Sequence, residues 1–335
     1  MRVAWRRDDP VIEADAIDLW TRHDLLPEGV DPAQRAKELI AAAYKDGQLA
    51  AVATGTIARI DFLRANFAII RGATAPEFRR SHAQLSLSLP GRAAMHAWAR
   101  KHPEEKYAGA IVFVDRGEWG DFCRLPVWPE SDLELVGHDQ HDRQIRARWF
   151  EDFRYDGPGG EGEPPRPPPA PPPLPADITL RPAWRRQDAG IERDAIAFWR
   201  RLGNLPGDVN PGERAKEVVL AAYREGRMVG ILTAAMGVLP QVRARLAMLR
   251  GSVDPELRRS HLGSWMSIEA RAMLESWSAA NPHERLAGLG GIVESPDLLV
   301  AQRLPYWPWP RLGVVGFTAD GRQIRVSWFR DFRLD

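Results

Sequence analysis

The sequence predicts an α/β protein made of two tandem copies of one domain, each a mixed, mostly antiparallel sheet flanked by helices. Three observations support this prediction. The 335-residue chain repeats itself at an offset of 179 positions, and a proline-rich segment separates the two copies. Within each copy, alternating strand-like patterns are interleaved with helix-like patterns of apolar residues. The protein is therefore expected to contain two similar domains rather than one large one.

Composition and cysteine content restrict the class of protein. The chain has 44% hydrophobic and 27% charged residues, which is a globular composition, and its sequence contains no apolar run of the roughly 18 residues that a membrane span needs. Cys123 is the only cysteine, which excludes an intrachain disulfide and a multi-cysteine metal site. The first ten residues lack the apolar core of a signal peptide, so we expect a cytoplasmic location.

The repeat extends over whole domains. Of the 155 positions paired between residues 2–156 and 181–335, 64 are identical. A period this long is that of a complete domain, not of one unit in a solenoid. We expect an N-terminal domain over residues 1–156 and a C-terminal domain over residues 179–335, paired within one chain about a pseudo-two-fold axis in a monomeric or dimeric protein. Residues 157–178 are a Pro/Gly-rich linker, either a spacer or a docking segment for an SH3-like partner.

The two copies differ in charge. Residues 1–156 carry 22 Lys and Arg against 25 Asp and Glu, whereas residues 179–335 carry 23 against 17. The C-terminal copy, at a net +6, is thus the better host for a polyanionic ligand, although a solvated basic face explains the same excess.

The second copy shows the order of elements most clearly, because its apolar spacing alternates between periods of two and about 3.6 residues. Asn281-Pro282 ends the long helix, and Asp320-Gly321 predicts the last hairpin turn. Strands are predicted over 179–184, 218–223, 227–236, 243–253, 286–293, 311–317 and 322–328, and helices over 191–201, 211–217, 264–280 and 297–304.

This order, together with one loop, resembles the GCN5-related N-acetyltransferase (GNAT) superfamily. The family typically reads V-x-P-E-[YF]-R-x-x-G-x-G between its fourth strand and its long helix, and residues 253–263 read VDPELRRSHLG. The hairpin over 218–233 also resembles the family's second and third strands. The resemblance implies two degenerate GNAT-like domains, with acetyl-CoA or another acyl-CoA as cosubstrate.

The physical chemistry of this loop suits such a cosubstrate. A strand that leads into a helix N-terminus presents backbone N–H groups without intrahelical partners, and the helix dipole adds partial positive charge, so a pyrophosphate fits there. The resemblance implies that the end of the fourth strand pairs with the pantetheine arm. The predicted cosubstrate-binding residues are Leu249, Gly251, Val253, Arg258, Arg259, Ser260, His261, Leu262, Gly263 and Ser264.

The loop also departs from the family pattern. Its first glycine is replaced by His82 and His261, and its second, Gly263, is Gln84 in the first copy. Pro90 falls inside the long helix of the first copy, which predicts a break or kink there. We therefore interpret the N-terminal copy as the degenerate one and place the acyl-CoA site in the C-terminal copy.

The family's usual proton carriers are missing. The fourth strand of each copy has no carboxylate, and Phe122 and Ala301 stand where many members carry a tyrosine on the last helix. Glu294, at the end of the fifth strand, is the candidate replacement base, or else a solvated strand end. Tyr306 is the candidate acid, or else packs beside a tryptophan, and His261 acts in catalysis, contacts phosphate or simply begins the helix.

Two further patterns leave alternatives open. Arg71 and Arg250, on the fourth strand of each copy, bind an acidic substrate or pair with Glu38 and Glu217. The segment 138–142, HDQHD, has metal-like spacing but lies at a hairpin tip and has no histidine in the second copy, so we expect no metal.

The leading hypothesis is an acyl-CoA-dependent N-acyltransferase, most simply an acetyltransferase, that acts on a small-molecule or peptide amine through its C-terminal domain. The alternative is a catalytically inactive tandem module that binds acyl-CoA, a peptide or a protein as a scaffold or sensor. Because the chain has no basic run and no nucleic-acid motif, a nucleic-acid partner is not expected. A membrane partner is not expected either.

Overall fold

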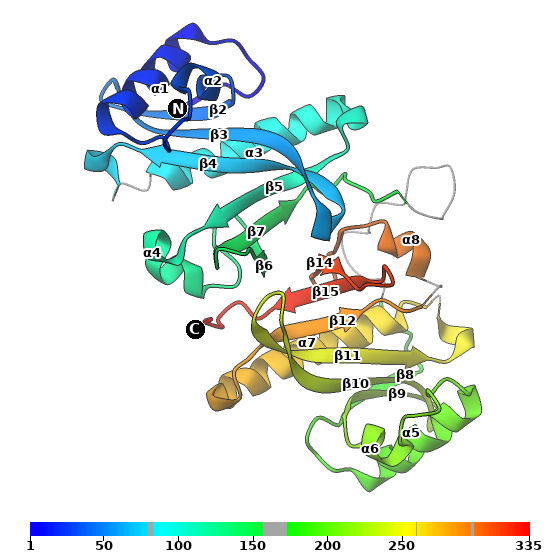
Figure 1. Cartoon of the computed structure of the whole chain (residues 1–335). Helices are drawn as coiled ribbons and strands as arrows, with labels where there is room; N and C mark the ends of the chain where they lie inside the picture. The colour runs from blue at the N-terminus through cyan, green and yellow to red at the C-terminus, as the bar shows by residue number, and fades with distance from the viewer. Residues whose placement is uncertain (80–82, 157–172, 259, 296–297) are drawn as a thin grey trace. The chain divides into compact units, whose positions relative to one another are not determined.

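The computed structural model describes residues 1–79, 83–156, 173–258, 260–295 and 298–335 (Figure 1). Contacts divide this chain into two units, residues 1–123 with 127–154 and residues 124–126 with 155–335. Within the described ranges, no helix is both long and apolar enough to cross a membrane.

The first unit contains a seven-stranded sheet in the order β1-β2-β3-β4-β5-β7-β6, in which only β4 and β5 pair in parallel. Its elements are β1 (Arg2–Val3), α1 (Pro10–His23), α2 (Pro32–Ala36), β2 (Leu39–Lys45), β3 (Gln48–Ile60), β4 (Ala65–Thr74), α3 (Ala83–Lys101), β5 (Tyr107–Val114), α4 (Arg116–Trp119), β6 (Glu134–His138) and β7 (Gln144–Trp149).

The second unit repeats this arrangement in an eight-stranded sheet, ordered β13-β14-β15-β12-β11-β10-β9-β8. Its elements are β8 (Ile178–Pro182), α5 (Ala189–Leu202), α6 (Pro211–Ala215), β9 (Val218–Arg224), β10 (Arg227–Leu239), β11 (Ala244–Val253), α7 (Leu262–Ala280), β12 (Leu286–Ile292), α8 (Leu299–Gln302), β13 (Tyr306–Trp307), β14 (Leu312–Phe317) and β15 (Gln323–Trp328). The predicted α/β class with two mixed, mostly antiparallel sheets is confirmed. The short strand β13 was not predicted, because two residues carry no readable period.

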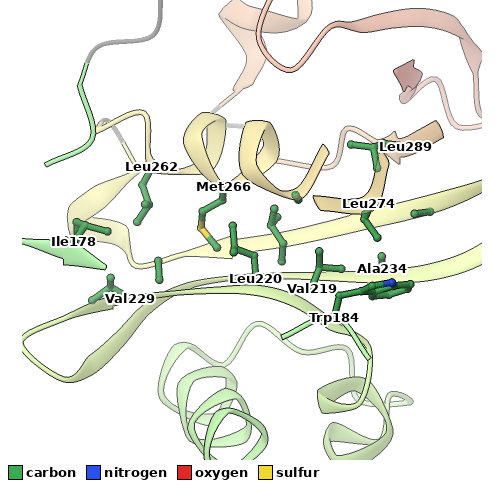
Figure 2. Packing of buried hydrophobic residues seen from close by; sticks show 14 of the residues in the cluster. Ile178, Trp184, Val219, Leu220, Val229, Ala234, Leu262, Met266, Leu274 and Leu289 are labelled. Atoms are coloured by element: carbon green, nitrogen blue, oxygen red, sulfur yellow. The ribbon is translucent and has the colours of Figure 1, made fainter. Parts of the chain in front are cut away.

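Helix α7 covers one face of the second sheet because its apolar residues recur every four positions. Leu262, Met266, Ala270 and Leu274 form this stripe, and all four are fully buried. Figure 2 shows the stripe packed against β9, β10 and β12, with contacts that include Val219, Leu220, Val229 and Leu289. A stripe of this kind supplies most of the stability of a helix in a globular protein.

Helix α5 covers the opposite face. Ile191, Ala195, Phe198 and Trp199 are buried in a cluster with residues of β9 and β10. The Asp188 side chain accepts hydrogen bonds from the amides of the helix's first turn, which caps its N-terminus. The second sheet is therefore a middle layer between α7 and the α5–α6 pair.

The break predicted at Pro90 is not found, because α3 runs uninterrupted from Ala83 to Lys101. Leu87 and Met95, on either side of the proline, are both buried. Their packing on the sheet stabilises the helix even though Pro90 cannot donate a backbone hydrogen bond. At Gly91 a Cβ would lie 2.9 Å from the Ile40 side chain, so the missing side chain allows close packing there.

Candidate functional site

The second sheet opens between β11 and β12. Strand β11 pairs with β10 over its whole length, but it pairs in parallel with β12 only from Arg245 to Met248. From residue 249 onward, this edge of β11 has no strand partner among the described residues. In the first unit, β4 and β5 part at the equivalent position, after Ile69.

Backbone groups at this open edge can be assigned a direction. The Asp254 amide donates to the Val229 carbonyl oxygen of β10 at 2.8 Å. Because backbone groups alternate between the two edges of a strand, the amides and carbonyls of Leu249, Gly251 and Val253 face away from β10. A Cβ on Gly291 would lie 3.7 Å from the Leu249 oxygen, which places this oxygen on the β12 side. All three predicted strand residues thus present backbone hydrogen-bonding groups at the open edge.

The loop after β11 keeps a glycine-like backbone without a glycine. A short 3₁₀ turn, Pro255–Leu257, leads to His261, which precedes α7 with φ 59° and ψ 12°. This left-handed conformation favours glycine and costs another residue roughly 1 kcal/mol. The histidine therefore adopts a backbone conformation that glycine takes without strain. Its side chain is exposed and makes no capping hydrogen bond with the helix.

Other predicted loop residues differ in what they can offer a ligand. Arg258 is exposed, whereas the Ser260 hydroxyl donates to the Leu257 carbonyl at 2.7 Å. The Leu262 side chain is fully buried, so only its backbone can contact a ligand. Arg259 lies outside the described residues.

The first turn of α7 is formed by Leu262, Gly263 and Ser264, whose amides precede the regular pattern of hydrogen bonds in the helix. At Gly263, the nearest atom to an added Cβ would be in the Val253 side chain, 3.9 Å away. Packing within the chain therefore does not require glycine there. His82 lies outside the described residues.

Glu294 lies just beyond the end of β12, and its environment differs from the one expected of a desolvated base. Its Oε1 accepts a hydrogen bond from Arg322 Nη1 at 2.7 Å, and its side chain is 64% exposed. The equivalent residue, Asp115, accepts from the Gly117 amide at 2.8 Å. The two carboxylates have therefore taken different local partners.

Tyr306 is not brought to the open edge. It lies on β13 and pairs with Gly313, which pairs with Val326, which in turn pairs with Gly290 of β12. Three strand spacings amount to roughly 14 Å, which is too far for direct proton transfer at the gap between β11 and β12. The neighbouring Trp307 donates its indole N–H to the Ala301 carbonyl at 2.7 Å.

The two arginines of the fourth strands have different partners. Arg71 lies 3.8 Å from the Glu38 carboxylate, which also accepts a hydrogen bond from Arg35 at 3.0 Å. Arg250 is exposed and makes no ion pair with any described residue, although Glu217 is paired with Arg214 at 3.0 Å. The structural ion pair is thus found in the first unit alone of the two described units.

In the metal-like segment 138–142, the Asp139 carboxylate is bonded to residues of the same hairpin turn. The Asp139 carboxylate accepts from the amides of His141 and Arg143 and from the Arg143 guanidinium. Across the described ranges, no group of three or more His, Cys, Asp or Glu side chains is placed to hold a metal ion.

A buried arginine of the second unit, Arg325, was missed by the sequence analysis. Arg325 lies 3.9 Å from the Trp307 ring centroid, and it donates to the Leu312 carbonyl and to the Gln323 side chain. Burial lowers its pKa to about 9. The repeated Arg-Gln-Ile-Arg of residues 143–146 and 322–325 was the signal that could have identified it. These contacts fix the segment between α8 and β14.

Comparisons with known proteins find distant similarities. No protein-family profile matches the chain. A GNAT-family acetyltransferase from Streptococcus pneumoniae is 16% identical, covers 44% of this chain and 96% of its own, and has a TM-score of 0.30. The structure of AtaTR bound with AcCoA is 14% identical, covers 46% and 94%, and has a TM-score of 0.29. An aminoglycoside acetyltransferase from a soil metagenome, solved with sisomicin, is 13% identical, covers 36% and 80%, and has a TM-score of 0.25.

A short sequence similarity leads to a different protein. Ribonuclease P protein component 2 of Halobacterium salinarum is 35% identical over 78 residues, which cover 20% of this chain and 48% of the relative. The chain thus spans about half the length of the curated relatives that it matches.

The element order, the loop into α7 and the parting of β11 from β12 agree with the sequence resemblance. The described chain holds two mixed sheets with the same order of elements, and this order is the one that the resemblance to GNAT domains implies.

Proposed function

We propose that the chain is an acyl-CoA-dependent N-acyltransferase, most simply an acetyltransferase, that works through its C-terminal domain. The observation that carries this proposal is the open edge of β11, where the backbone of Leu249, Gly251 and Val253 faces a gap next to the N-terminus of α7. An extended amide-containing arm is able to add to such an edge as a further strand would.

The described residues fit such a cosubstrate. Gly251 is exposed and Leu249 and Val253 are half-buried, so a ligand can reach this part of the strand. Arg258 is exposed on the loop that leads to α7, where charge and free helix amides favour phosphate. Acyl-CoA would supply the acyl group as a thioester. The protein would hold its arm along β11 and its phosphates at the loop.

The remaining requirement is a group that receives the proton of the amine. We assign this role to Glu294, because it lies just beyond the end of β12, next to the gap, and Arg322 holds its carboxylate by a hydrogen bond. Its exposure lets a water molecule relay the proton. Tyr306 is too far from the gap to donate a proton directly, and we assign to His261, on the loop before α7, contact with phosphate rather than with the reacting atoms.

The alternative function, an inactive module that binds acyl-CoA, a peptide or a protein, rests on the missing carboxylate of the fourth strand and the missing helix tyrosine. It needs the same open edge but no base.

Calorimetry with coenzyme A and acetyl-CoA, together with mass spectrometry of ligand retained through native purification, tests the shared part of both proposals. We expect binding of one molecule with one domain dominant. Turnover of amines in a broad acceptor panel then separates the enzyme from the inactive module. If neither coenzyme A nor acetyl-CoA binds, the proposed function is wrong.

A further inference from the structure

The two units differ in the partners of the arginine that both carry on the fourth strand, Arg71 and Arg250. Arg71 donates to the Thr56 hydroxyl at 3.3 Å and lies near the Glu38 carboxylate. The position equivalent to Thr56 is Ala235, which has no hydroxyl to accept such a bond. Arg250 accordingly has no side-chain hydrogen bond or ion pair within the part of the chain that the structure describes. One substitution in the repeat has thus removed a partner that holds the arginine in place.

The surface beside Arg250 is more polar than the equivalent surface of the first unit. Asn204, in the loop after α5, donates to the Ser252 hydroxyl at 2.9 Å. The equivalent residues are Leu25 and Ala73, which pack against the apolar core of the first unit. Two apolar positions beside the arginine have therefore become polar, hydrogen-bonding positions in the second unit.

These polar groups share one face of the sheet. Leu249 packs against the α7 cluster, so its neighbours on the strand, Arg250 and Ser252, point to the face that carries α5 and α6. Thr233, which is paired with Arg250, is in turn paired with Val218 next to Glu217. Arg250 thus lies one residue from the open backbone of Gly251 and on the opposite face of the sheet from α7.

Charge on this face is not balanced. The Glu217 carboxylate is already paired with Arg214, so it neutralises that guanidinium. Arg250 is left as an exposed, uncompensated cation beside the Ser252 hydroxyl, whose proton remains a possible donor because its oxygen accepts from Asn204. A guanidinium matches the two oxygens of a carboxylate with parallel hydrogen bonds.

We propose that Arg250 is a specificity-determining residue that binds a carboxylate of the acceptor, so that the acceptor class is amines that also carry a carboxylate, such as amino acids and short peptides. The proposal rests on the proposed function, because it takes the gap next to Gly251 as the place where the acyl group arrives. Arg250 orients the acceptor and takes no part in proton transfer.

The test compares acceptors that differ only in this group. Dipeptides with a free C-terminal carboxylate and the same dipeptides as C-terminal amides are offered to the wild type, Arg250→Ala and Arg71→Ala. We expect kcat/KM to favour the free acids by about 10- to 100-fold in the wild type, the range of a hydrogen bond to a charged group. Arg250→Ala should lose this preference and Arg71→Ala should keep it. Coenzyme A affinity, measured by calorimetry, should stay unchanged in both variants.

A variant that gives Arg250 a hydrogen-bond partner provides the reciprocal test. Ala235→Thr restores the hydroxyl found in the first unit and should reduce the preference for free acids by a few-fold, because it gives Arg250 a competing partner. Equal turnover of acids and amides by the wild type, or equal effects of Arg250→Ala and Arg71→Ala, would overturn this inference and leave the proposed function intact. If coenzyme A does not bind at all, the proposed function fails. The inference is then decided by calorimetry with the free dipeptides, where binding abolished in Arg250→Ala supports it and no binding by the wild type overturns it.

Discussion

The two domains share one backbone plan and differ in the side chains on one face. Strands β3 and β4 pair through ten residues, from Ala51↔Thr74 to Ile60↔Ala65, and β10 and β11 pair through the ten equivalent positions. The parallel strands part at equivalent residues as well. The two copies therefore share the gap between their parallel strands.

The face that carries the first two helices has diverged. Ala75 of the first unit is Asp254 in the second, where it is buried and pairs with Arg201 at 2.7 Å. Together with the changes around Arg250, this substitution adds polar groups near the end of the fourth strand. The comparison indicates that the fold tolerates such side-chain changes because the strand pairing, which is the same in both units, maintains the backbone. Differences in function are therefore best sought where the side chains of the two copies differ.

The largest expected effect tests what the domains share. A Cβ on Gly109 would lie 2.1 Å from the Arg148 carbonyl oxygen, and one on Gly288 would lie 2.4 Å from that of Ser327. Gly109→Ala and Gly288→Ala should each lower the free energy of unfolding by about 3 kcal/mol, because backbone must move. Denaturant unfolding measures this, with Gly237→Ala as the control, since no atom lies within 4 Å of its added Cβ. A harmless Gly288→Ala would refute the close approach of β12 and β15.

The next largest effect compares the two equivalent carboxylates that follow the fifth strand of each domain, Glu294 and Asp115. Glu294→Gln should lower turnover about 100-fold near neutral pH with coenzyme A affinity unchanged, because it removes the proposed base and keeps the shape. Turnover should partly recover at high pH, where the amine arrives neutral. Asp115→Asn, in the position occupied by a helix-capping carboxylate, should leave turnover as it is. If Glu294→Gln turns over at the wild-type rate, the ion pair with Arg322 is purely structural.

Charge reversal in the two loops should sharpen the difference in ligand binding. Arg258→Glu is expected to weaken coenzyme A binding by about 10- to 100-fold, since it replaces the proposed phosphate partner by a charge of the same sign as the phosphate. Arg79, the equivalent residue, is also exposed, and Arg79→Glu should change affinity far less. Calorimetry at two salt concentrations measures both, and the wild-type affinity should fall as salt rises. Equal losses would show that the N-terminal domain binds the ligand as well.

The smallest effect concerns the diverged face itself. Asp254→Ala introduces the residue of the first unit and should lower the free energy of unfolding by roughly 1–2 kcal/mol, because Arg201 loses its partner. Burial opposes ionisation of Asp254, but the hydrogen bond and charge of Arg201 outweigh it and hold the pKa of this carboxyl below its usual value. Its contribution is therefore present above the unfolded pKa and is lost as the pH falls through the lower folded pKa.

Stability measured from neutral to acid pH tests this sign. The wild type and Asp254→Ala should differ most at neutral pH and converge in acid. A difference that grows on acidification would contradict the assigned pKa shift.

The sequence by itself determined the duplication and the order of elements. These features follow from local periodicity, since an apolar stripe every four residues predicts α7 and alternation predicts the strands. The backbone residues Leu249, Gly251 and Val253 were predicted from the resemblance to the GNAT superfamily, and the alternation of backbone groups along a strand is consistent with their sharing one edge.

Only the tertiary structure decided the partners of long polar side chains. Glu294 meets Arg322, and Arg250 is left without the partners that Arg71 has, because such contacts depend on the register of strands far apart in the sequence. Tyr306 is removed from the gap by β14 and β15, which lie between β13 and β12. Pro90 is accommodated because packing on both sides outweighs one lost hydrogen bond. Sequence spacing records neither long-range register nor packing, so these outcomes could be read only from the folded chain.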